Sequence, residues 1–506
     1  MGCEVAASYF PQSVRYLQRT GLARLGCAPK FSDQVIAMPK PLTLAMYASV
    51  PATAESLRMR HREKAPPRAR SSGGRTASNE ADAKRKSLPL PVFLLLISIQ
   101  LPWLISIGPL RFTPYRLVLI ALLPLLLLRW SKRAAGAIRV TDIALLLLCG
   151  WCAFAMCVIH GVGPSVEPAG VYFIETMGGF LVARCYIRDQ ESFYLMSRML
   201  FIITAVLLPF ALHESVTGRR FVAEVFEMVF PTYPGVEMQR WGLTRAQVNY
   251  IHPIHFGVSI GCTLTLIWLV VGYGQPLFSR FAKAGLVFFT SFLALSSGPL
   301  TSVIAQIGLM GWGRVMQRIP MKWTLMGVGG IIFVALVELF ANRSLAVILI
   351  GMFAFDEFSA YIRTLTWEYG TQSIMNHPLF GVGFNMWDKP DWLTASIDMH
   401  WILDAVRHGI PAGILTFTAF FSAVIAIGRA RISDPKHIAY RAAYMFTMAG
   451  FFMTGWAVYF WESTFVLFMF LLGSGFWILD HQDPPAARKS ARRQKIRHPS
   501  GVSANS

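Results

Sequence analysis

Apolar runs separated by short polar segments follow one another along most of the chain, from residue 88 to residue 480. Most are close to the 18 or more residues that about 30 Å of hydrocarbon requires of a helix. They lie near residues 90–108, 113–128, 140–160, 171–187, 193–212, 251–272, 284–298, 300–316, 323–341, 401–427, 441–459 and 464–479. Because a chain that crosses lipid must satisfy its backbone polar groups internally, these runs are expected to be helical. The pattern predicts an all-α polytopic membrane protein with about twelve transmembrane helices.

The segments on either side of this apolar region are polar and basic, and the formal net charge of the chain is +20. We interpret residues 1–87 as a disordered cytoplasmic N-terminal segment, residues 88–480 as the transmembrane domain and residues 481–506 as a basic cytoplasmic tail. Basic tails also occur in proteins that bind nucleic acid. Attraction to anionic membrane lipid explains them here, so we expect membrane lipid and no nucleic acid as a partner.

Basic residues indicate which loops face the cytoplasm. With a cytoplasmic N-terminus, the inward loops carry Arg129, Lys132, Arg133, Arg139, Arg184, Arg188, Arg280, Lys283, Arg314, Arg318, Lys322, Arg429, Arg431, Lys436 and Arg441. This distribution agrees with the positive-inside rule, and an even number of spans returns the C-terminus to the same side. The sequence therefore predicts a multi-pass protein of the bacterial inner membrane with both termini in the cytoplasm.

Two outward loops are long, about 213–250 and about 342–400, and both contain many aromatic and apolar residues. Long loops of this kind are usually functional. Within the second loop, the apolar run Leu345–Phe355 is too short to cross a bilayer, so we interpret it as an interfacial or re-entrant piece.

The outward side is rich in arginine and has Lys389 as its only lysine. Its arginines are Arg111, Arg219, Arg220, Arg240, Arg245, Arg343, Arg363 and Arg407. The planar guanidinium grips phosphate oxygens in pairs, so the set indicates a diphosphate-bearing ligand. The alternative is pairing with the outward carboxylates, which are Glu214, Glu224, Glu227, Glu237, Asp356 and Glu357.

Histidines show the same outward bias, and histidine is the usual proton-transfer group near neutral pH. His252 and His255 share one helical face, yet no Cys, Asp or Glu nearby completes a metal site. Cys149 and Cys152 have CxxC spacing inside an apolar run, where small packing residues are the simpler interpretation. The chain also has no Asp-x-Asp element for a metal–nucleotide-sugar complex. We therefore expect no metal, no cofactor, and a lipid-linked sugar donor.

Short elements in a fixed order carry a family resemblance. They are Arg363-Thr-Leu-Thr-Trp367, Asn376-His377-Pro378-Leu-Phe-Gly381-Val-Gly383, Asp398-Met-His400 and Gly409-Ile-Pro-Ala-Gly413. Together with Arg240-Trp-Gly242 and the large late loop, they resemble the O-antigen ligase and polymerase superfamily. The chain reads His400-Trp401 where that family often has His-Asn, and Ser296-Ser297-Gly298 where Ser-Arg-Gly is common. Arg245, Arg363 or Arg407 is then the candidate to replace the missing arginine.

The resemblance implies glycosyl transfer from undecaprenyl diphosphate on the periplasmic face. His400 is the candidate base, oriented by Asp398 or Asp404. The candidates for diphosphate binding are Arg240, Arg245, Arg363 and Arg407, and the candidates for contacting the acceptor or supporting the site are His377, Glu175 and Trp401. We favour a polymerase of O-antigen or exopolysaccharide repeat units, with a flippase and a chain-length regulator as further partners. The alternatives are a ligase of the same fold and a transporter of lipid-linked oligosaccharide.

Overall fold

The computed structural model describes residues 87–108, 110–236, 238–340, 348 and 357–482, all of them in the unit Lys86–Ser506. Several sequence predictions fall outside these ranges. They concern residues 1–86, Glu237, Arg343, the run Leu345–Phe355, Asp356 and residues 483–506.

The described part is mostly helical. In chain order its elements are α2 (Leu90–Ser98), β1 (Ile105–Ile107), β2 (Leu110–Phe112), α3 (Pro114–Ser131), α4 (Val140–His160), α5 (Val162–Phe173), the π-helix η2 (Ile174–Gly178), α6 (Gly179–Tyr186), α7 (Gln190–Thr217), α8 (Phe221–Glu227), β3 (Gln239–Arg240), β4 (Leu243–Thr244), α9 (Pro253–Gly261), α10 (Leu264–Leu266), the π-helix η3 (Ile267–Val271), α11 (Leu277–Phe292), α12 (Ser297–Val315), α13 (Lys322–Phe340), α15 (Glu357–Asn376), α16 (His400–His408), α17 (Ile410–Gly428), α18 (Pro435–Thr454), α19 (Glu462–Ser474) and α20 (Trp477–Asp480).

Local sequence explains several of these boundaries. Proline opens α3, α9 and α18, where its missing N–H would have no helical partner in any case. Asp189 caps α7, because its carboxylate accepts a hydrogen bond of 2.7 Å from the Ser192 N–H. The short strands form two antiparallel pairs, β1 with β2 and β3 with β4.

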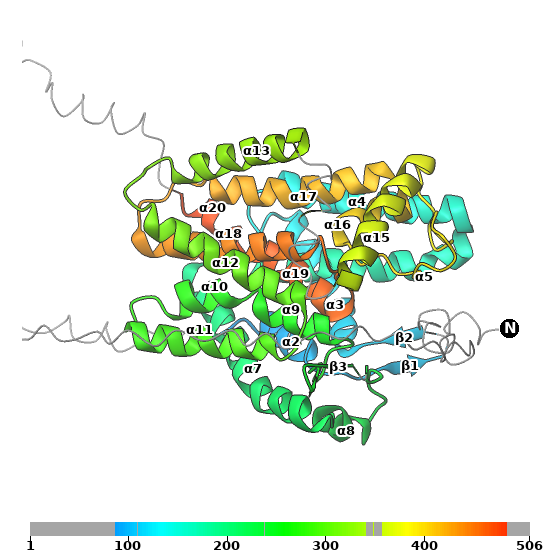
Figure 1. Ribbon diagram of the computed structural model, residues 1–506, viewed down its shortest axis with the longest axis horizontal. Coiled ribbons are helices and arrows are strands. Elements are labelled where there is room, and N and C mark those ends of the chain that lie inside the picture. Colours follow the sequence, from blue (N-terminus) through cyan, green and yellow to red (C-terminus); the bar gives the residue numbers. More distant parts are fainter. Residues whose placement is uncertain (1–86, 109, 237, 341–347, 349–356, 483–506) are drawn as a thin grey trace, which may run out of the picture. The chain divides into compact units, whose positions relative to one another are not determined.

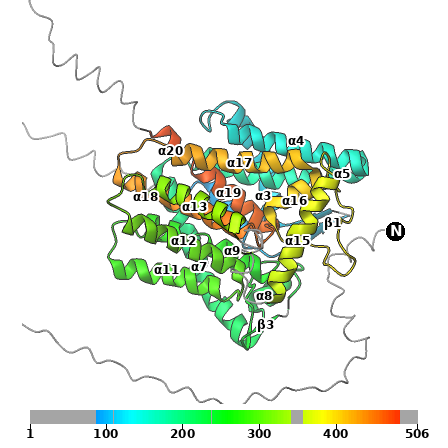
Figure 2. The same ribbon diagram turned by 45° about the horizontal axis from the view of Figure 1, so that its top comes forward.

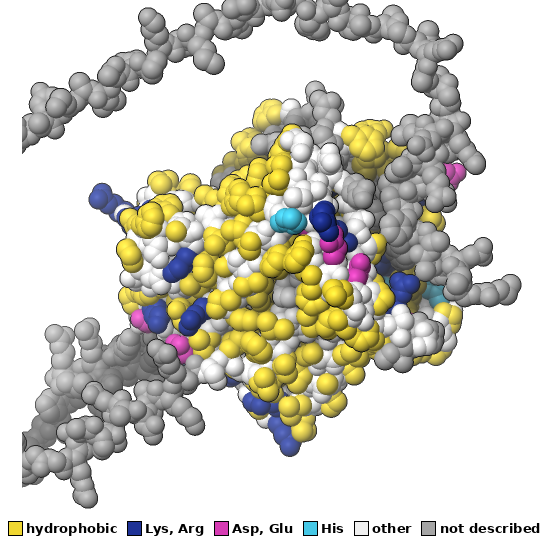
Figure 3. All heavy atoms as spheres, turned by 90° about the horizontal axis from the view of Figure 1, so that it is seen from below, with side chains coloured by type: hydrophobic (Ala, Val, Ile, Leu, Met, Phe, Trp, Pro, Cys, Tyr) yellow, Lys and Arg dark blue, Asp and Glu magenta, His cyan; other side chains and the backbone are white. Residues whose placement is uncertain are grey.

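The coarse fold prediction is confirmed: the chain is helical, and seven helices in its described part are long and apolar enough to cross a membrane. These are Pro114–Ser131, Val140–His160, Gln190–Thr217, Pro253–Val271, Lys322–Phe340, Ile410–Gly428 and Glu462–Asp480. The count of about twelve spans stays a prediction. Figure 3 shows one face of the molecule on which hydrophobic side chains form a broad surface with few charges, as a lipid-facing protein requires.

Some predicted boundaries are wrong. The predicted span 90–108 ends as a helix at Ser98, and the chain then enters the β1–β2 hairpin. The predicted span 401–427 is broken at Gly409, whose left-handed φ of 84° separates α16 from α17. The turn expected at Ser297-Gly298-Pro299 lies before these residues, which instead form the first turn of α12.

The helices meet at two ends that are easy to define by contact. At the first, which we name the site end, α3, α9, α12 and α19 all begin, and their first residues touch one another as described below. At the opposite end the start of α4 contacts the end of α6, since Arg184 lies 3.5 Å from Asp142. Figure 1 shows α15, α16 and the β1–β2 hairpin toward the right and α20 toward the left. Helix α4 packs along α17 and α5 in both ribbon views (Figures 1 and 2).

Candidate functional site

Three of the predicted diphosphate-binding arginines converge on the start of α12. Arg245 donates from Nε to the carbonyl of Ala294 at 3.1 Å, and Arg240 donates from Nη1 to the carbonyl of Leu295 at 3.3 Å. Arg363, at a distant point in the sequence, reaches the Ser297 hydroxyl with Nη1 at 3.5 Å. The structure thus gathers cations from the 213–250 loop and from α15 around one short turn.

The helix start at this turn adds to the positive potential. Ser296 is the N-cap of α12, and its side chain makes no capping hydrogen bond. The first N–H groups of a helix have no partner within the helix and favour a nearby anion. Leu295, immediately before, is held at a left-handed φ of 45°, a strained conformation for a non-glycine residue. Strain of this kind often accompanies functional sites.

Arg245 is the least compensated of these cations. Its side chain is buried, with 5% exposed, and it donates hydrogen bonds to the Ala294 carbonyl and, at 3.2 Å, to the Met238 thioether. Among the described residues no carboxylate lies within salt-bridge distance of it. Burial, followed by the nearby Arg240, lowers the pKa of Arg245 to about 10, so it remains charged at neutral pH.

The loop Gly455–Trp461, between α18 and α19, contacts both the start of α12, where the arginines converge, and the predicted residues His255 and His400. Val458 packs against Gly298, where an added Cβ would lie 2.6 Å from its Cγ2. The Trp461 ring is 5.5 Å from the ring of His255, and the Tyr459 ring is 6.2 Å from that of His400. No sequence motif indicated that this loop belongs to the site, although its Tyr-Phe-Trp-Glu sequence is an unusual cluster of aromatic residues before a helix.

His400, the predicted base, lies at the start of α16 in an aromatic enclosure. Its ring is 4.6 Å from the Phe460 ring and 5.6 Å from the Phe468 ring. Neither ring nitrogen has a hydrogen-bond partner among the described residues. The adjoining cavity has a volume of about 10 Å³, which is enough for about one water molecule and far too little for a sugar.

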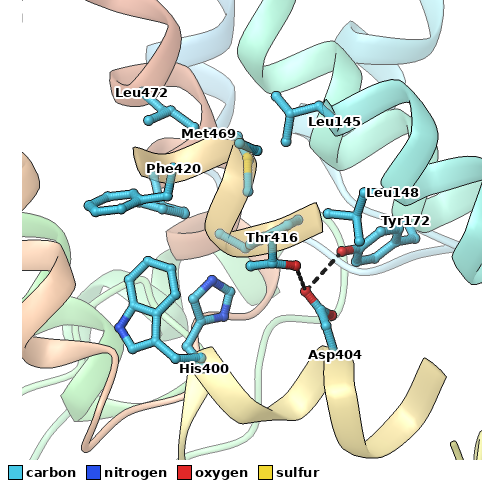
Figure 4. A pocket seen from close by; sticks show the side chains of 13 residues that line it. Leu145, Leu148, Tyr172, His400, Asp404, Thr416, Phe420, Met469 and Leu472 are labelled. Carbon is cyan, nitrogen blue, oxygen red and sulfur yellow. Dashed lines mark hydrogen bonds between the residues drawn. The ribbon is translucent and has the colours of Figure 1, made fainter. Parts of the chain in front are cut away.

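Asp404 lines the same cavity but does not orient His400. Its carboxylate accepts hydrogen bonds from Thr416 at 2.7 Å and from Tyr172 at 3.3 Å, while the His400 ring projects into the cavity beside it (Figure 4). Asp398 is exposed and lies within electrostatic reach of Arg363 rather than of His400. The predicted orienting contact to His400 is thus absent for both carboxylates in the described structure.

The two halves of the resembling motif pack directly against each other. Gly383 N–H donates to the carbonyl of Arg407 at 2.8 Å, and Ile410 N–H donates to that of Pro378 at 2.8 Å. A Cβ on Gly381 would lie 2.4 Å from the Arg407 backbone, and one on Gly409 would lie 2.0 Å from the Leu379 carbonyl oxygen. These glycines therefore allow a close backbone approach that fixes Arg407 beside the rings of Phe384 and Tyr459, each 5.8 Å away.

The remaining candidates lie in different surroundings. Trp401 is 1% exposed, donates to the Phe452 carbonyl at 2.8 Å and packs in the helical core, so its role in this structure is support. His377 is exposed and lies 3.6 Å from Asp388. Of the outward arginines, Arg219 follows the alternative interpretation, because it pairs with Glu224 at 2.8 Å on the surface.

Glu175 belongs to a buried polar group that the sequence did not reveal as a unit. Its carboxylate lies 2.7 Å from Arg116, and Arg116 lies 3.0 Å from Glu462. Tyr115 is hydrogen-bonded to both carboxylates. The signal available in the sequence was an ionisable residue near the end of each of three apolar runs, which is costly in a membrane and therefore informative.

No known family model matches the chain, and no curated protein matches it. The geometry described above therefore carries the functional argument.

Proposed function

We propose that this protein is a membrane glycosyltransferase that uses a sugar donor linked to a lipid diphosphate. The observation that carries the proposal is the convergence of Arg240, Arg245 and Arg363 at the start of α12. A diphosphate supplies the negative charge that a buried arginine without a carboxylate partner requires.

The position of Arg363 supports the family resemblance from an independent direction. This chain has Ser297 where the resembling family commonly has arginine. The Arg363 guanidinium, from another helix, occupies the space next to that serine. A cation is thus supplied at the same point of the fold by a different part of the chain.

In the reaction, an acceptor hydroxyl attacks the anomeric carbon of the donor. A new glycosidic bond forms, the bond to the diphosphate oxygen breaks, and the lipid diphosphate leaves with the electron pair. The arginines and the α12 N-terminus stabilise the charge that grows on this leaving group. Direct displacement inverts the anomeric centre. No metal is needed for these steps, because the cations of the chain supply the positive charge.

The site end is proposed to face the periplasm across the bacterial inner membrane. The supporting observation is the distribution of charge, since the arginines at the opposite end belong to the loops that the positive-inside rule assigns to the cytoplasm. About twelve spans with both termini in the cytoplasm complete this topology. His400 stays a predicted base, and its ring is enclosed by aromatic rings of α16, of α19 and of the Gly455–Trp461 loop.

We favour repeat-unit polymerisation of O-antigen or exopolysaccharide, with undecaprenyl diphosphate as the lipid and a flippase and chain-length regulator as partners. Ligation to lipid A-core or another acceptor uses the same site and differs in the acceptor. Transport of lipid-linked oligosaccharide would place charged groups deep within several spans.

The test is complementation of a strain that lacks the gene, with wild type, Arg240→Ala and His400→Ala at matched membrane levels. Loss of long glycans while single repeats are still transferred supports the polymerase. Accumulation of long lipid-linked chains that never reach an acceptor supports the ligase. Full activity of both variants contradicts the proposed site.

A further inference from the structure

A second charged group lies at the site end, where α3, η2 and α19 meet. It consists of Tyr115 and Arg116 at the start of α3, Glu175 in the π-helix η2, and Glu462 at the first position of α19. The π-helix adds one residue to the turn and re-aims the side chains that follow, a feature that is frequent at functional sites. Three separate helices therefore position this group.

The two carboxylates share one cation. Arg116 donates from Nε to Glu175 Oε1 at 2.7 Å, and its Nη2 lies 3.0 Å from Glu462 Oε1. Tyr115 approaches Glu175 Oε1 at 3.2 Å and makes a closer hydrogen bond to Glu462 Oε2. A hydroxyl has one proton, so Tyr115 donates to one carboxylate at a time. Within the described residues, Arg116 is the one cation at salt-bridge distance, and the pair keeps one carboxylate in excess.

Glu462 is the more accessible of the two carboxylates. Its side chain is 19% exposed, against 9% for Glu175. Its backbone adopts a left-handed φ of 52°, which places the carboxylate at the very start of α19. A partly exposed carboxylate can contact the hydroxyl of a bound acceptor and accept its proton.

A second observation does not depend on the charge of this group. Two buried polar atoms, one in Thr113 and one in His255, have no hydrogen-bond partner among the described residues. Thr113, two residues before Tyr115, is the N-cap residue of α3 and is 1% exposed. Its hydroxyl makes no capping hydrogen bond and has no partner. His255 is 4% exposed, and its Nδ1 lacks a partner while its ring contacts that of Trp461, the residue before Glu462. Buried polar atoms are nearly always hydrogen-bonded, so these two have hydrogen-bonding capacity left for a hydroxyl-bearing ligand.

The group also lies next to the proposed donor site. Trp461 joins Glu462 to His255 on α9, and Val458 of the same loop packs on Gly298 at the start of α12. The start of α12 is where Arg240, Arg245 and Arg363 converge. The Gly455–Trp461 loop thus connects Glu462 to the start of α12.

We propose that Glu462, supported by Glu175 and Arg116, binds the acceptor sugar and, in place of the enclosed His400, takes the proton from the attacking hydroxyl. This inference rests on the proposed glycosyl transfer. The hydroxyl oxygen bonds to the anomeric carbon, the bond to the diphosphate oxygen breaks, and the hydroxyl proton moves to the Glu462 carboxylate. The carboxylate then releases the proton to water at the site end. Glu175 and Arg116 are positioning residues.

The experiment uses the purified full chain in proteoliposomes, with the lipid-linked oligosaccharide that accumulates in a strain lacking the gene. Release of lipid diphosphate is followed as a function of pH for wild type, Glu462→Gln, Glu462→Asp, Glu175→Gln and Glu224→Gln. Glu224 is the matched control, because it is an exposed carboxylate that pairs with Arg219. Binding of the lipid-linked oligosaccharide is measured in parallel.

We expect Glu462→Gln to lower the rate at least about 100-fold, the usual contribution of a general base, with donor binding unchanged. The rise of rate with pH is lost in this variant, retained in Glu462→Asp and displaced in Glu175→Gln. Glu462→Gln with a rate within twofold of wild type and the same pH profile overturns the inference. If Glu462→Gln does not fold, an unchanged pH profile in Glu175→Gln overturns it. Absence of lipid diphosphate release by wild type contradicts the proposed function instead.

Discussion

The arginines that converge on the start of α12 and the arginines at the opposite end of the bundle have different partners. At the opposite end, Arg184 lies 3.5 Å from Asp142, and Arg188 lies 2.7 Å from Asp480. Arg184 also donates to the carbonyl of Ala137 at 2.7 Å. At the site end, Arg245 donates hydrogen bonds to a carbonyl and to a thioether.

The difference shows that the number of arginines indicates an anion-binding site less well than the absence of carboxylates beside them. A buried guanidinium matched by a carboxylate and by carbonyls ties helices together. One that is surrounded by carbonyls and a helix N-terminus has capacity for an external anion. The comparison can be tested by removing charges at each end and asking whether stability or activity responds.

The largest expected effect is on stability, at the opposite end. Asp142→Asn leaves the 2%-exposed Arg184 without its carboxylate, and breaking a buried ion pair costs about 3–5 kcal/mol of folding free energy. We expect a lower midpoint of thermal unfolding in detergent and unchanged activity per folded molecule. An unchanged midpoint would show that the two ends are not distinguished by buried pairing.

The next effect is on activity, at the site end. Arg245→Gln removes a preorganised donor to the leaving group, and such donors contribute about 100-fold or more in rate. We expect a loss of this size in lipid diphosphate release with the thermal midpoint retained. The matched control is Arg219→Gln in the same loop, which removes an exposed, paired arginine. Equal losses in both variants would contradict the assignment of Arg245.

A smaller effect tests whether Arg363 replaces the missing family arginine. A hydrogen bond to a charged group contributes about 1.5–3 kcal/mol, so Arg363→Ala is expected to raise the KM for the donor by roughly tenfold or more. Adding Ser297→Arg to this variant restores a guanidinium at the start of α12. Recovery of KM in the double variant is the expected result, and a further loss would mean that Arg363 acts elsewhere.

The smallest effect is expected at the exposed pair of Arg219 and Glu224, whose side chains are 71% and 45% exposed. Surface ion pairs contribute little because water and salt screen them. Glu224→Gln should leave both the thermal midpoint and the rate of lipid diphosphate release within error of wild type. A clear loss of rate would place this part of the 213–250 loop in the site.

The helical character of the chain was predictable because apolar length is read directly from the sequence. Details that depend on backbone geometry were not. The break at Gly409 falls inside a continuous apolar run, and glycine is required there by its left-handed φ and by its close approach to Leu379. The turn before α12 lies earlier in the chain than predicted, because Pro299 suits the first turn of a helix as well as it suits a loop.

The candidate site was predictable in part. Arginine enrichment together with the family resemblance pointed to Arg240, Arg245, Arg363 and Arg407. The structure brings the first three together, although Arg363 is far away in sequence. The sequence could not indicate that the His400 ring is enclosed by rings from α19 and the preceding loop, because these residues come together only in the tertiary structure. The pairing of Glu175 with Glu462 was equally hidden, since the two lie in helices that are remote along the chain.

The most direct test of glycosyl transfer is to reconstitute the purified protein with lipid-linked oligosaccharide and to identify the products by mass spectrometry. The account predicts free lipid diphosphate together with glycan extended by one or more repeats, both formed about 100-fold more slowly by Arg245→Gln. Intact donor that has moved across the bilayer without loss of its lipid diphosphate would contradict the account and establish a transporter.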